Sequence, residues 1–335
     1  MSKSIASFSG KTAFITGGSG GLGKALAQSL ASQGCNVTIF ARREGALAAA
    51  EAEIKTVALS ASQEIRSVQV DVGDASKVEE AFRSQPRVAD VLFCAAGGNH
   101  AENGFLLDIS AKQLANCMHN NYFTSLYPAK SILGIWTEED AQFAASPIDG
   151  APKLRQIVFV SSAAAFVALP GSVAYNPAKS AVRALADTLR LEVMRYSCAT
   201  SKYSIHCVFP GDFVSPGFYL EQDTKTPLTK RIQGTDKPLK ELETKFPSSH
   251  AVASGVIQAV EAGDFVICKD SMAASLLFTS MTGPSPKRGL GIADSLLGWV
   301  VSWIVWPVLR SKWAQMCRED GDAARESQKS QQVTN

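Results

Sequence analysis

The stretch TGGSGGLGKAL, residues 16–26, decides the fold of this chain. It follows the short apolar run TAFIT (12–16) and opens a helical pattern, with Gly17, Gly21 and Gly23 in the spacing TGxxxGxG. Glycines so placed permit a tight turn and close approach of the backbone to a pyrophosphate, which the helix N-terminus attracts with its N–H groups and dipole. Because a strand precedes the glycines and a helix follows them, the sequence predicts a dinucleotide-binding loop here.

The same alternation of apolar runs and helical patterns continues to residue 211. Further strands are expected at 36–40, 65–72, 89–97, 156–162 and 204–211, with helices in most of the intervals. Continuous apolar strands separated by helices indicate a parallel sheet covered on both faces. Right-handed crossovers then give an α/β fold of the doubly wound Rossmann type.

Composition argues against several other classes of protein. The chain has 335 residues, a net charge of +2 and 46% hydrophobic residues, so no nucleic-acid partner is expected. Its seven cysteines form no CxxC pair and indicate reduced thiols in a cytosolic environment, and the four histidines share no ligand spacing. We therefore expect neither a disulfide framework nor a metal site, and the N-terminus shows no apolar secretory signal.

The end of the second expected strand indicates which nucleotide binds. NAD enzymes usually place an acidic side chain there to bind the ribose hydroxyls, but this chain has Arg42 and Arg43. Two guanidinium groups suit a 2′-phosphate by charge and geometry, so NADPH is favoured over NADH. A solvated basic turn is the alternative. Asp71, at the end of the third expected strand, lies where it could meet the adenine amine.

The stretch SVAYNPAKS (172–180) places Tyr175 and Lys179 one helical turn apart on one face. Pro177 is tolerated only near a helix start, so the pair is expected in the first turn. A neighbouring cation would pull the pKa of the phenol toward neutrality, as a general acid near pH 7 requires. This spacing also arises by chance, in which case the pair is a half-buried ring and a solvated amine. Ser162 ends an upstream strand, where its hydroxyl could hold a carbonyl oxygen beside the tyrosine.

Four motifs in this order resemble the short-chain dehydrogenase/reductase family: TGxxxGxG at 16–23, Ser162, YxxxK at 175–179 and Pro-Gly at 210–211. The resemblance covers about residues 10–220. Asn121, in HNNYFTSLY, falls where the family has its fourth catalytic residue.

The resemblance implies hydride transfer from NADPH to a ketone, with Tyr175 as proton donor. Ser162 would polarise the carbonyl, Lys179 would lower the pKa of Tyr175 and hold the nicotinamide ribose, and Asn121 would hold a water that resupplies the proton. Ser215 would bond the carboxamide. The expected cofactor contacts are Gly17, Ser19, Gly21, Leu22, Gly23, Arg42, Arg43, Asp71, Val72, Ala96, Gly97, Tyr175, Lys179, Pro210, Gly211 and Ser215.

Two further features follow from the resemblance. The chain has CAAG at 94–97 where the family usually has NNAG, and Cys94 cannot supply the same amide hydrogen bonds near the adenine. The family commonly pairs helices between subunits, including the one that follows Tyr175, which is compatible with a homodimer.

A narrower resemblance points to 3-ketodihydrosphingosine reductases. SPGFYLEQDTKTPLTKRI (215–232) resembles their lid, NYFTSLYPAK (121–130) resembles their Asn-Tyr element, and the hydrophobic tail is similar to that of fungal members. This resemblance implies NADPH-dependent reduction of the 3-keto group of a long-chain sphingoid base. It also implies a place at the endoplasmic reticulum membrane, with the catalytic domain facing the cytosol.

Other functions stay open at this point. A ketoreductase for a sphinganine-like polyketide in a natural-product pathway would look the same, and a retinoid, steroid or other lipophilic ketone is a further substrate class. A non-catalytic nucleotide-binding regulator, or a membrane scaffold that uses only the tail, would leave the four catalytic residues unexplained.

The sequence predicts three parts: a catalytic domain at 1–270, a hydrophobic membrane-associating segment at 271–315 and a polar, disordered tail at 316–335. Within the first part, the polar stretch 137–155 reads as a surface excursion, and the loop-rich stretch at about 212–245 reads as a substrate lid.

The apolar tail is too short for a simple membrane span. The run from 295 to 309 has only 15 residues, whereas a span needs about 20. Trp299, Trp303 and Trp306 share one helical face, and tryptophan favours the headgroup boundary. We therefore expect a helix or hairpin inserted in one leaflet, where a long-chain substrate also partitions; a buried core or interface helix is the alternative.

Overall fold

The computed structural model describes residues 7–98, 101–143, 151–167 and 169–271, with scattered positions beyond residue 271. Its centre is a seven-stranded sheet in the order β3-β2-β1-β4-β5-β6-β7, with every neighbouring pair parallel. The strands are β1 (Thr12–Thr16), β2 (Asn36–Ala41), β3 (Ile65–Gln69), β4 (Val91–Cys94), β5 (Lys153–Val160), β6 (Ser201–Val208) and β7 (Val266–Ile267). The expected doubly wound parallel sheet is confirmed.

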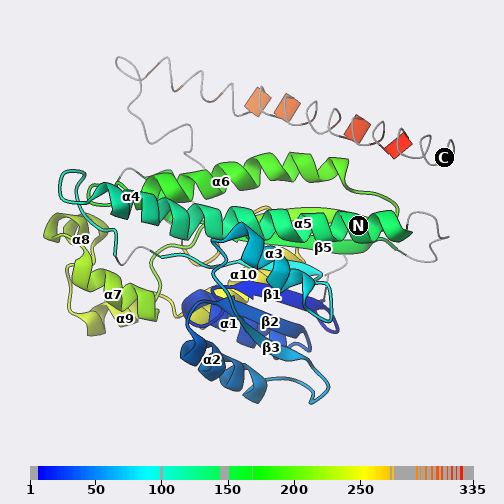
Figure 1. Ribbon diagram of the computed structural model, residues 1–335. Coiled ribbons are helices and arrows are strands. Elements are labelled where there is room, and N and C mark those ends of the chain that lie inside the picture. Colours follow the sequence, from blue (N-terminus) through cyan, green and yellow to red (C-terminus); the bar gives the residue numbers. More distant parts are fainter. Residues whose placement is uncertain are drawn as a thin grey trace.

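Helices cover both faces of this sheet (Figure 1). One core cluster joins α1 (Gly21–Ala31), α2 (Glu44–Thr56) and α10 (Ser249–Glu261) to the sheet, through residues such as Leu26 and Val256. The other joins α3 (Ala75–Arg83), α5 (Thr124–Phe143) and α6 (Tyr175–Glu192), with Trp136 fully buried. These two layers fix the sheet, so the loops at the carboxyl ends of its strands are held on a rigid base.

Several strands are shorter at their carboxyl ends than the apolar runs predict. The runs 65–72 and 89–97 contain β3 and β4, which end at Gln69 and Cys94, and the run 204–211 overlaps β6, which begins at Ser201 and ends at Val208. The residues that follow turn out of the sheet although they remain apolar. These are the residues at which a Rossmann fold builds its site, because ligands bind outside the carboxyl ends of the strands.

The stretch 137–155 is not the surface excursion that its polar residues predicted. α5 continues through Phe143, and β5 already begins at Lys153; residues 144–150 lie outside the described part. The carboxylates of this stretch form contacts instead: Glu138 accepts from Arg83 at 2.7 Å, and Asp140 accepts from Ser201 at 2.6 Å. The charges that suggested a loop are therefore the polar face of a helix end.

The stretch 212–245 is also more regular than expected. It forms three short helices, α7 (Pro216–Thr224), α8 (Pro227–Gln233) and α9 (Leu239–Lys245), grouped beyond one end of the sheet (Figure 1). Ser215 and Thr226 cap the first two, each followed by a proline at the first helical position. Proline is favoured there because its missing N–H is not needed, so these prolines start helices and do not break them. We call residues 212–245 the lid.

The predicted segments 271–315 and 316–335 lie almost entirely outside the described residues. Among the residues that are described, no helix is both long enough and apolar enough to cross a membrane.

Candidate active site

The predicted glycine loop forms the turn between β1 and α1. Gly17 and Gly21 have φ of 70° and 52°, in the region that disfavours other residues. A side chain at Gly17 would meet the backbone of Ala96 at 2.7 Å, and one at Gly23 would meet the Gly17 carbonyl at 2.3 Å. The loop is thus packed backbone against backbone and leaves no room for a Cβ at these two positions.

The N-terminus of α1 is suited to bind an anion. No side chain caps it at Gly20, and no acidic residue lies in its first turn. Its N–H groups and positive dipole end therefore face the loop without competition from a side chain. Ser19 is half-buried in this turn. Leu22 packs in the hydrophobic core and is 6% exposed.

The predicted nucleotide-selecting residues follow β2 and β3. Arg42 and Arg43 are both exposed, and Arg42 Nη1 donates to Asn120 Oδ1 at 3.4 Å. Asp71 Oδ1 accepts from the Gly73 amide at 3.0 Å, while Val72 is buried. The two arginines thus present their charge at the carboxyl end of β2, as the sequence predicts.

Tyr175, Lys179 and Ser162 come together at the carboxyl end of β5. α6 begins at Tyr175, so Pro177 lies in the first turn as expected. Lys179 is 4% exposed, its ammonium lies 5.6 Å from the centroid of the Tyr175 ring, and it donates to the Val160 carbonyl at 3.1 Å. Ser162 lies near enough to the Tyr175 hydroxyl to lower the pKa of the phenol, and its Oγ accepts from the Ala164 amide at 3.1 Å.

Asn121 lies in a π-helical turn, η1 (His119–Phe123), between α4 (Ala111–Met118) and α5. Such turns recur at functional sites. Asn121 is fully buried; its Nδ2 donates to the Gly98 carbonyl at 2.9 Å and its Oδ1 accepts from the Gly98 amide at 3.1 Å. A Cβ at Gly97 would lie 2.8 Å from Asn121 Oδ1 and 3.3 Å from Lys179 Nζ. Gly97 therefore brings the β4 loop against two of the predicted catalytic side chains.

The predicted lowering of the Tyr175 pKa is wrong for the chain by itself. Burial raises this pKa above its ordinary value, the carboxylate of Glu221 raises it further, and the hydrogen bond with Ser162 opposes both. Burial also lowers the pKa of Lys179, to about 8. Both shifts have the same main cause, because burial keeps water away from the phenol and from the Lys179 ammonium and disfavours the charged form of each.

The loop after β6 completes the site. The Pro210 carbonyl accepts from the Ala163 amide at 2.9 Å, and the Gly211 amide donates to Asp270 Oδ2 at 3.1 Å. Ser215 Oγ accepts from the Phe218 amide at 3.1 Å, so this hydroxyl caps α7. To bind the nicotinamide carboxamide as predicted, the Ser215 hydroxyl would have to keep accepting from the Phe218 amide at the same time.

Cys94 stands at the end of β4, where the resemblance predicts a polar side chain. It is fully buried, and its Sγ lies 3.7 Å from the Ser125 carbonyl. Thr16 Oγ1 supports this loop by accepting from the Ala96 amide at 3.3 Å. A hydroxyl of β1 thus makes a side-chain contact to this loop.

The lid contributes residues that the sequence did not single out. Glu221 on α7 and Asp212 after β6 both act electrostatically on Tyr175. Lys225, whose side chain is 2% exposed, pairs with Glu221 at 3.1 Å. In the sequence Asp212 and Glu221 are ordinary members of a charged stretch, and only the tertiary structure shows that their charges act on the tyrosine.

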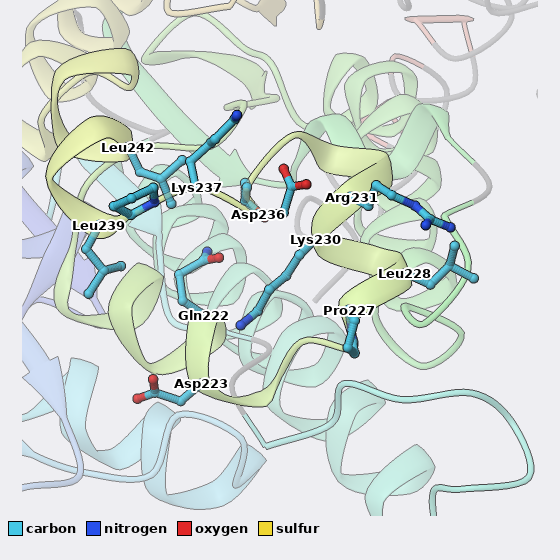
Figure 2. Close-up of a pocket in the computed structure, with 12 residues that line it drawn as sticks. Gln222, Asp223, Pro227, Leu228, Lys230, Arg231, Asp236, Lys237, Leu239 and Leu242 are labelled. Atoms are coloured by element: carbon cyan, nitrogen blue, oxygen red, sulfur yellow. The ribbon is translucent and has the colours of Figure 1, made fainter.

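The lid also encloses a cavity of about 780 Å³ between α7, α8 and α9 (Figure 2). Gln222 from α7 and Lys230 from α8 extend into this space, and Leu239 and Leu242 border it from α9. Tyr175 does not line it. The cavity therefore belongs to the lid and not to the catalytic residues.

Fold and site together are those of a dinucleotide-binding oxidoreductase, with a serine, a tyrosine and a lysine brought together at the carboxyl end of β5. The chain belongs to the short-chain dehydrogenase family, whose model matches residues 11–218. That range contains all four predicted catalytic residues.

Comparison with known proteins finds relatives whose reported activity is more specific than the family. The chain is 34% identical to a 3-ketodihydrosphingosine reductase of Aspergillus fumigatus, over 90% of this chain and 83% of the relative. It is 31% identical to a 3-ketodihydrosphingosine reductase of Neurospora crassa, over 91% and 83%. A short-chain dehydrogenase/reductase of Burkholderia phymatum, crystallised with NAD, matches the fold with a TM-score of 0.65 at 21% identity, over 85% of this chain and 100% of that one.

Proposed function

We propose that this protein reduces the 3-keto group of a long-chain sphingoid base, converting 3-ketodihydrosphingosine to dihydrosphingosine with NADPH. The observation that carries the proposal is the likeness to 3-ketodihydrosphingosine reductases over nine-tenths of the chain, which includes the lid as well as the nucleotide-binding core. A likeness limited to the core would support only the reaction type.

The residues fit a nicotinamide dinucleotide. The loop at Gly17 and Gly23 is a cradle that a Cβ would fill, and the α1 N-terminus offers N–H groups to the pyrophosphate. Arg42 and Arg43 are exposed at the end of β2, which suits the 2′-phosphate of NADPH. Asp71, Val72, Ala96, Pro210 and Ser215 stand at the neighbouring strand ends as further contacts.

Bound NADPH supplies the hydride, which goes to the carbonyl carbon of the substrate. Ser162 and Tyr175 would hold the carbonyl oxygen, and the electron pair of the broken π bond would take up the Tyr175 proton. Lys179 would stabilise the phenolate that remains and hold the ribose. Its lowered pKa, about 8, lets it exchange a proton near neutral pH.

Asn121 would act mainly by positioning in this mechanism. Its side chain joins Gly98 to the π-turn, so it fixes the β4 loop beside Lys179. The water expected to resupply the proton would then be held at this turn, next to the lysine.

The membrane is the proposed source of the substrate, since a ketone on a long alkyl chain partitions there. We propose that residues 271–315 associate with the cytosolic face of the endoplasmic reticulum, that residues 1–270 form the catalytic domain and that 316–335 are a polar tail. Support comes from Trp299, Trp303 and Val308, whose side chains are 59%, 71% and 62% exposed. A homodimer through α6 is compatible with this arrangement.

The test is NADPH oxidation by the full-length protein with 3-ketodihydrosphingosine in mixed micelles. We expect turnover with this substrate and at least about tenfold lower kcat/KM with short-chain ketones. Selective turnover of a polyketide ketone that lacks the sphingoid head group would contradict the proposal and favour a natural-product reductase.

A further inference from the structure

The cavity in the lid is lined by buried polar groups that lack partners. Gln222, which extends into the cavity from α7 (Figure 2), is 5% exposed, and Thr235, which also lines it, is 2% exposed. Within the part of the chain that the structure describes, the two amide atoms of Gln222 and the hydroxyl of Thr235 have no hydrogen-bond partner. Buried polar groups are nearly always hydrogen-bonded, because an unpaired one costs free energy. These two side chains therefore indicate a site for a polar ligand.

Three cations line the same cavity: Lys230, Arg231 and Lys237. None of their charged groups pairs with a carboxylate of the described residues. Two carboxylates, those of Asp223 and Asp236, also belong to the lining, so the walls carry a surplus of one positive charge. A phosphate diester matches this lining, because it carries one negative charge and its oxygens accept hydrogen bonds from ammonium, guanidinium, amide and hydroxyl groups.

The chain around the cavity is basic. Between residues 226 and 240 it has four basic residues and one acidic residue, and the other acidic residues of the lid lie before residue 224 or after residue 240. The basic residues are Lys230, which is half-buried, and Arg231, Lys237 and Lys240, which are exposed. Lysine and arginine side chains that face the solvent are attracted to the negative surface of an anionic membrane. α8 and the turn that follows it therefore present a suitable charge to such a surface.

Exposed apolar side chains accompany this basic part. Between residues 7 and 271, most of the large hydrophobic residues that are exposed lie in the lid or in the loop before α4. Leu228 and Ile232 lie one turn apart on α8 and are 37% and 52% exposed. Single exposed hydrophobic residues are ordinary, but a group of them at one end of a molecule marks an interaction surface.

The loop before α4 extends this apolar surface. Leu107 in this loop is 96% exposed. Asn103 Nδ2 of the same loop donates to Thr224 Oγ1 of α7 at 2.8 Å, so the loop is held against the lid. α4 and the three lid helices lie at the same end of the sheet (Figure 1). Apolar and basic side chains together suit the interface of a bilayer, because the apolar ones enter the acyl boundary while the charges stay among the headgroups.

Hydrogen bonds join α8 to the segment that leads into Tyr175. The buried Thr229 hydroxyl on α8 donates to the Pro170 carbonyl at 2.9 Å. The Tyr175 amide donates to the Ser172 carbonyl at 3.1 Å. A surface bound by α8 would therefore lie beside the chain that positions the tyrosine.

We propose that the lid docks on a membrane surface and that its cavity binds the phosphate headgroup of an anionic phospholipid. Gln222, Lys230 and Lys237 hold the headgroup, while Leu228 and Ile232 enter the acyl boundary. This contact is separate from any that residues 271–315 make. The docked lid brings the reacting centre to the surface from which a long-chain ketone would enter, and only this last consequence rests on the proposed function.

The experiment measures hydrogen exchange in α8 and α9 of the full-length protein. Exchange is followed in buffer, with phosphatidylcholine vesicles, with vesicles in which about one-fifth of the lipid is phosphatidylserine, and with inorganic phosphate. Because the measurement is made in the lid helices themselves, vesicle binding by residues 271–315 does not imitate the expected result.

Three variants test which residues are responsible. Gln222→Met removes the buried amide without changing the charge, and Lys230→Gln removes one cation of the cavity. Lys240→Gln is the matched control, because Lys240 is exposed, belongs to the same basic stretch and does not line the cavity. NADPH affinity, measured by fluorescence titration, reports whether each variant is folded.

Vesicles with phosphatidylserine should slow exchange in α8 and α9 at least about fivefold, because a bound lipid stabilises the folded lid, whereas phosphatidylcholine alone or inorganic phosphate should change it less than about twofold. The affinity for the anionic vesicles follows from the dependence of exchange on lipid concentration. Gln222→Met should lower this affinity about 3- to 10-fold and Lys230→Gln about tenfold, through the lost hydrogen bonds. Lys240→Gln should lower it less than about fivefold, the effect of one basic residue near a charged surface.

Each of three results would overturn the proposal. Equal exchange with both kinds of vesicle would show that the lid does not recognise an anionic lipid. Equal slowing by inorganic phosphate would make the cavity an anion site with no part in docking. A loss of affinity in Lys240→Gln as large as that in Lys230→Gln would reduce the effect to general surface attraction. Should Gln222→Met fail to bind NADPH, the comparison of the two lysine variants still decides the matter.

The outcome is distinct from a test of the proposed function. If anionic vesicles slow exchange in a lid whose protein does not reduce 3-ketodihydrosphingosine, the docking stands and the proposed reaction is wrong. If the protein reduces this ketone and its lid exchanges equally with all vesicles, the docking is wrong and the reaction stands.

Discussion

The glycine loop and the lid border the same reacting centre, but they are built by different physical means. In the loop, backbone packs on backbone: a Cβ at Gly23 would come within 2.3 Å of the Gly17 carbonyl. In the lid, short helices are capped by side chains and fastened by hydroxyls, such as Thr229 to the Pro170 carbonyl at 2.9 Å. The first arrangement is suited to a nucleotide, and the second carries charged side chains on helices outside the core clusters.

This difference teaches where specificity resides. A backbone cradle on a seven-stranded sheet cannot readily be altered without disturbing the fold. Charged side chains on α7 can be exchanged at modest cost to the core, because no residue of this helix belongs to either core cluster, although Phe218 is buried. We therefore expect substitutions at the base of the site to affect the reaction itself, and substitutions in the lid to affect which ketone is accepted.

The largest expected effect tests the base of the site. Tyr175→Phe removes the proton donor and keeps the ring, so kcat should fall at least about a hundredfold while NADPH still binds. Steady-state kinetics and a fluorescence titration of NADPH measure the two quantities. Turnover close to that of wild type would show that the tyrosine has only a structural role. The proposed division between catalytic residues at the strand ends and selective residues in the lid would then be wrong.

The next effect concerns the nucleotide. Arg42→Ala combined with Arg43→Ala should raise the KM for NADPH about 10- to 100-fold, since charge-assisted hydrogen bonds to the 2′-phosphate are lost. The KM for NADH should change little. Kinetics with both nucleotides provide the check, and equal use of NADPH and NADH by the wild type would contradict the assignment.

The buried lysine makes the base of the site sensitive to pH. Because burial lowers the Lys179 pKa from 10.5 to about 8, the folded chain releases this proton before the unfolded chain does as pH rises. Stability attributable to Lys179 should thus increase between pH 8 and 10.5, by up to about 1.4 kcal/mol per pH unit. Denaturant unfolding of wild type and Lys179→Met across this range measures it; parallel pH profiles would show an ordinary, solvated lysine.

The smallest expected effect lies in the lid. Thr226→Ala removes the N-cap of α8 and should lower the local stability of that helix by about 1 kcal/mol. Hydrogen exchange should become faster in α8 with little change in the core strands. Thr244→Ala is the control, because that exposed hydroxyl only donates to the Glu241 carbonyl within α9. A matching loss of protection in β1 and β4 would mean that lid and core unfold together.

The sequence predicted the nucleotide-binding half closely because its signals are local. The glycine spacing at 16–23, the strand before it and the first-turn position of Tyr175 each depend on a few adjacent residues. The lid was misread as a loop-rich stretch, whereas Pro216 and Pro227 each follow a serine or threonine cap and begin a helix. The charged end of α5 was misread as a loop, because its partners Arg83 and Ser201 lie far away in the chain.

By itself, then, the sequence determined the α/β class and the glycine loop, and it predicted Asn121, Ser162, Tyr175 and Lys179 as the catalytic residues. Only the tertiary structure decided how these groups are charged. The Tyr175 pKa is raised, against expectation, because burial and a carboxylate from α7 outweigh the lowering effect of Ser162. A motif consists of residues that are close together in the sequence. The electrostatic environment of a side chain depends instead on all the charged and polar groups that the fold brings near it, and on how far water is excluded.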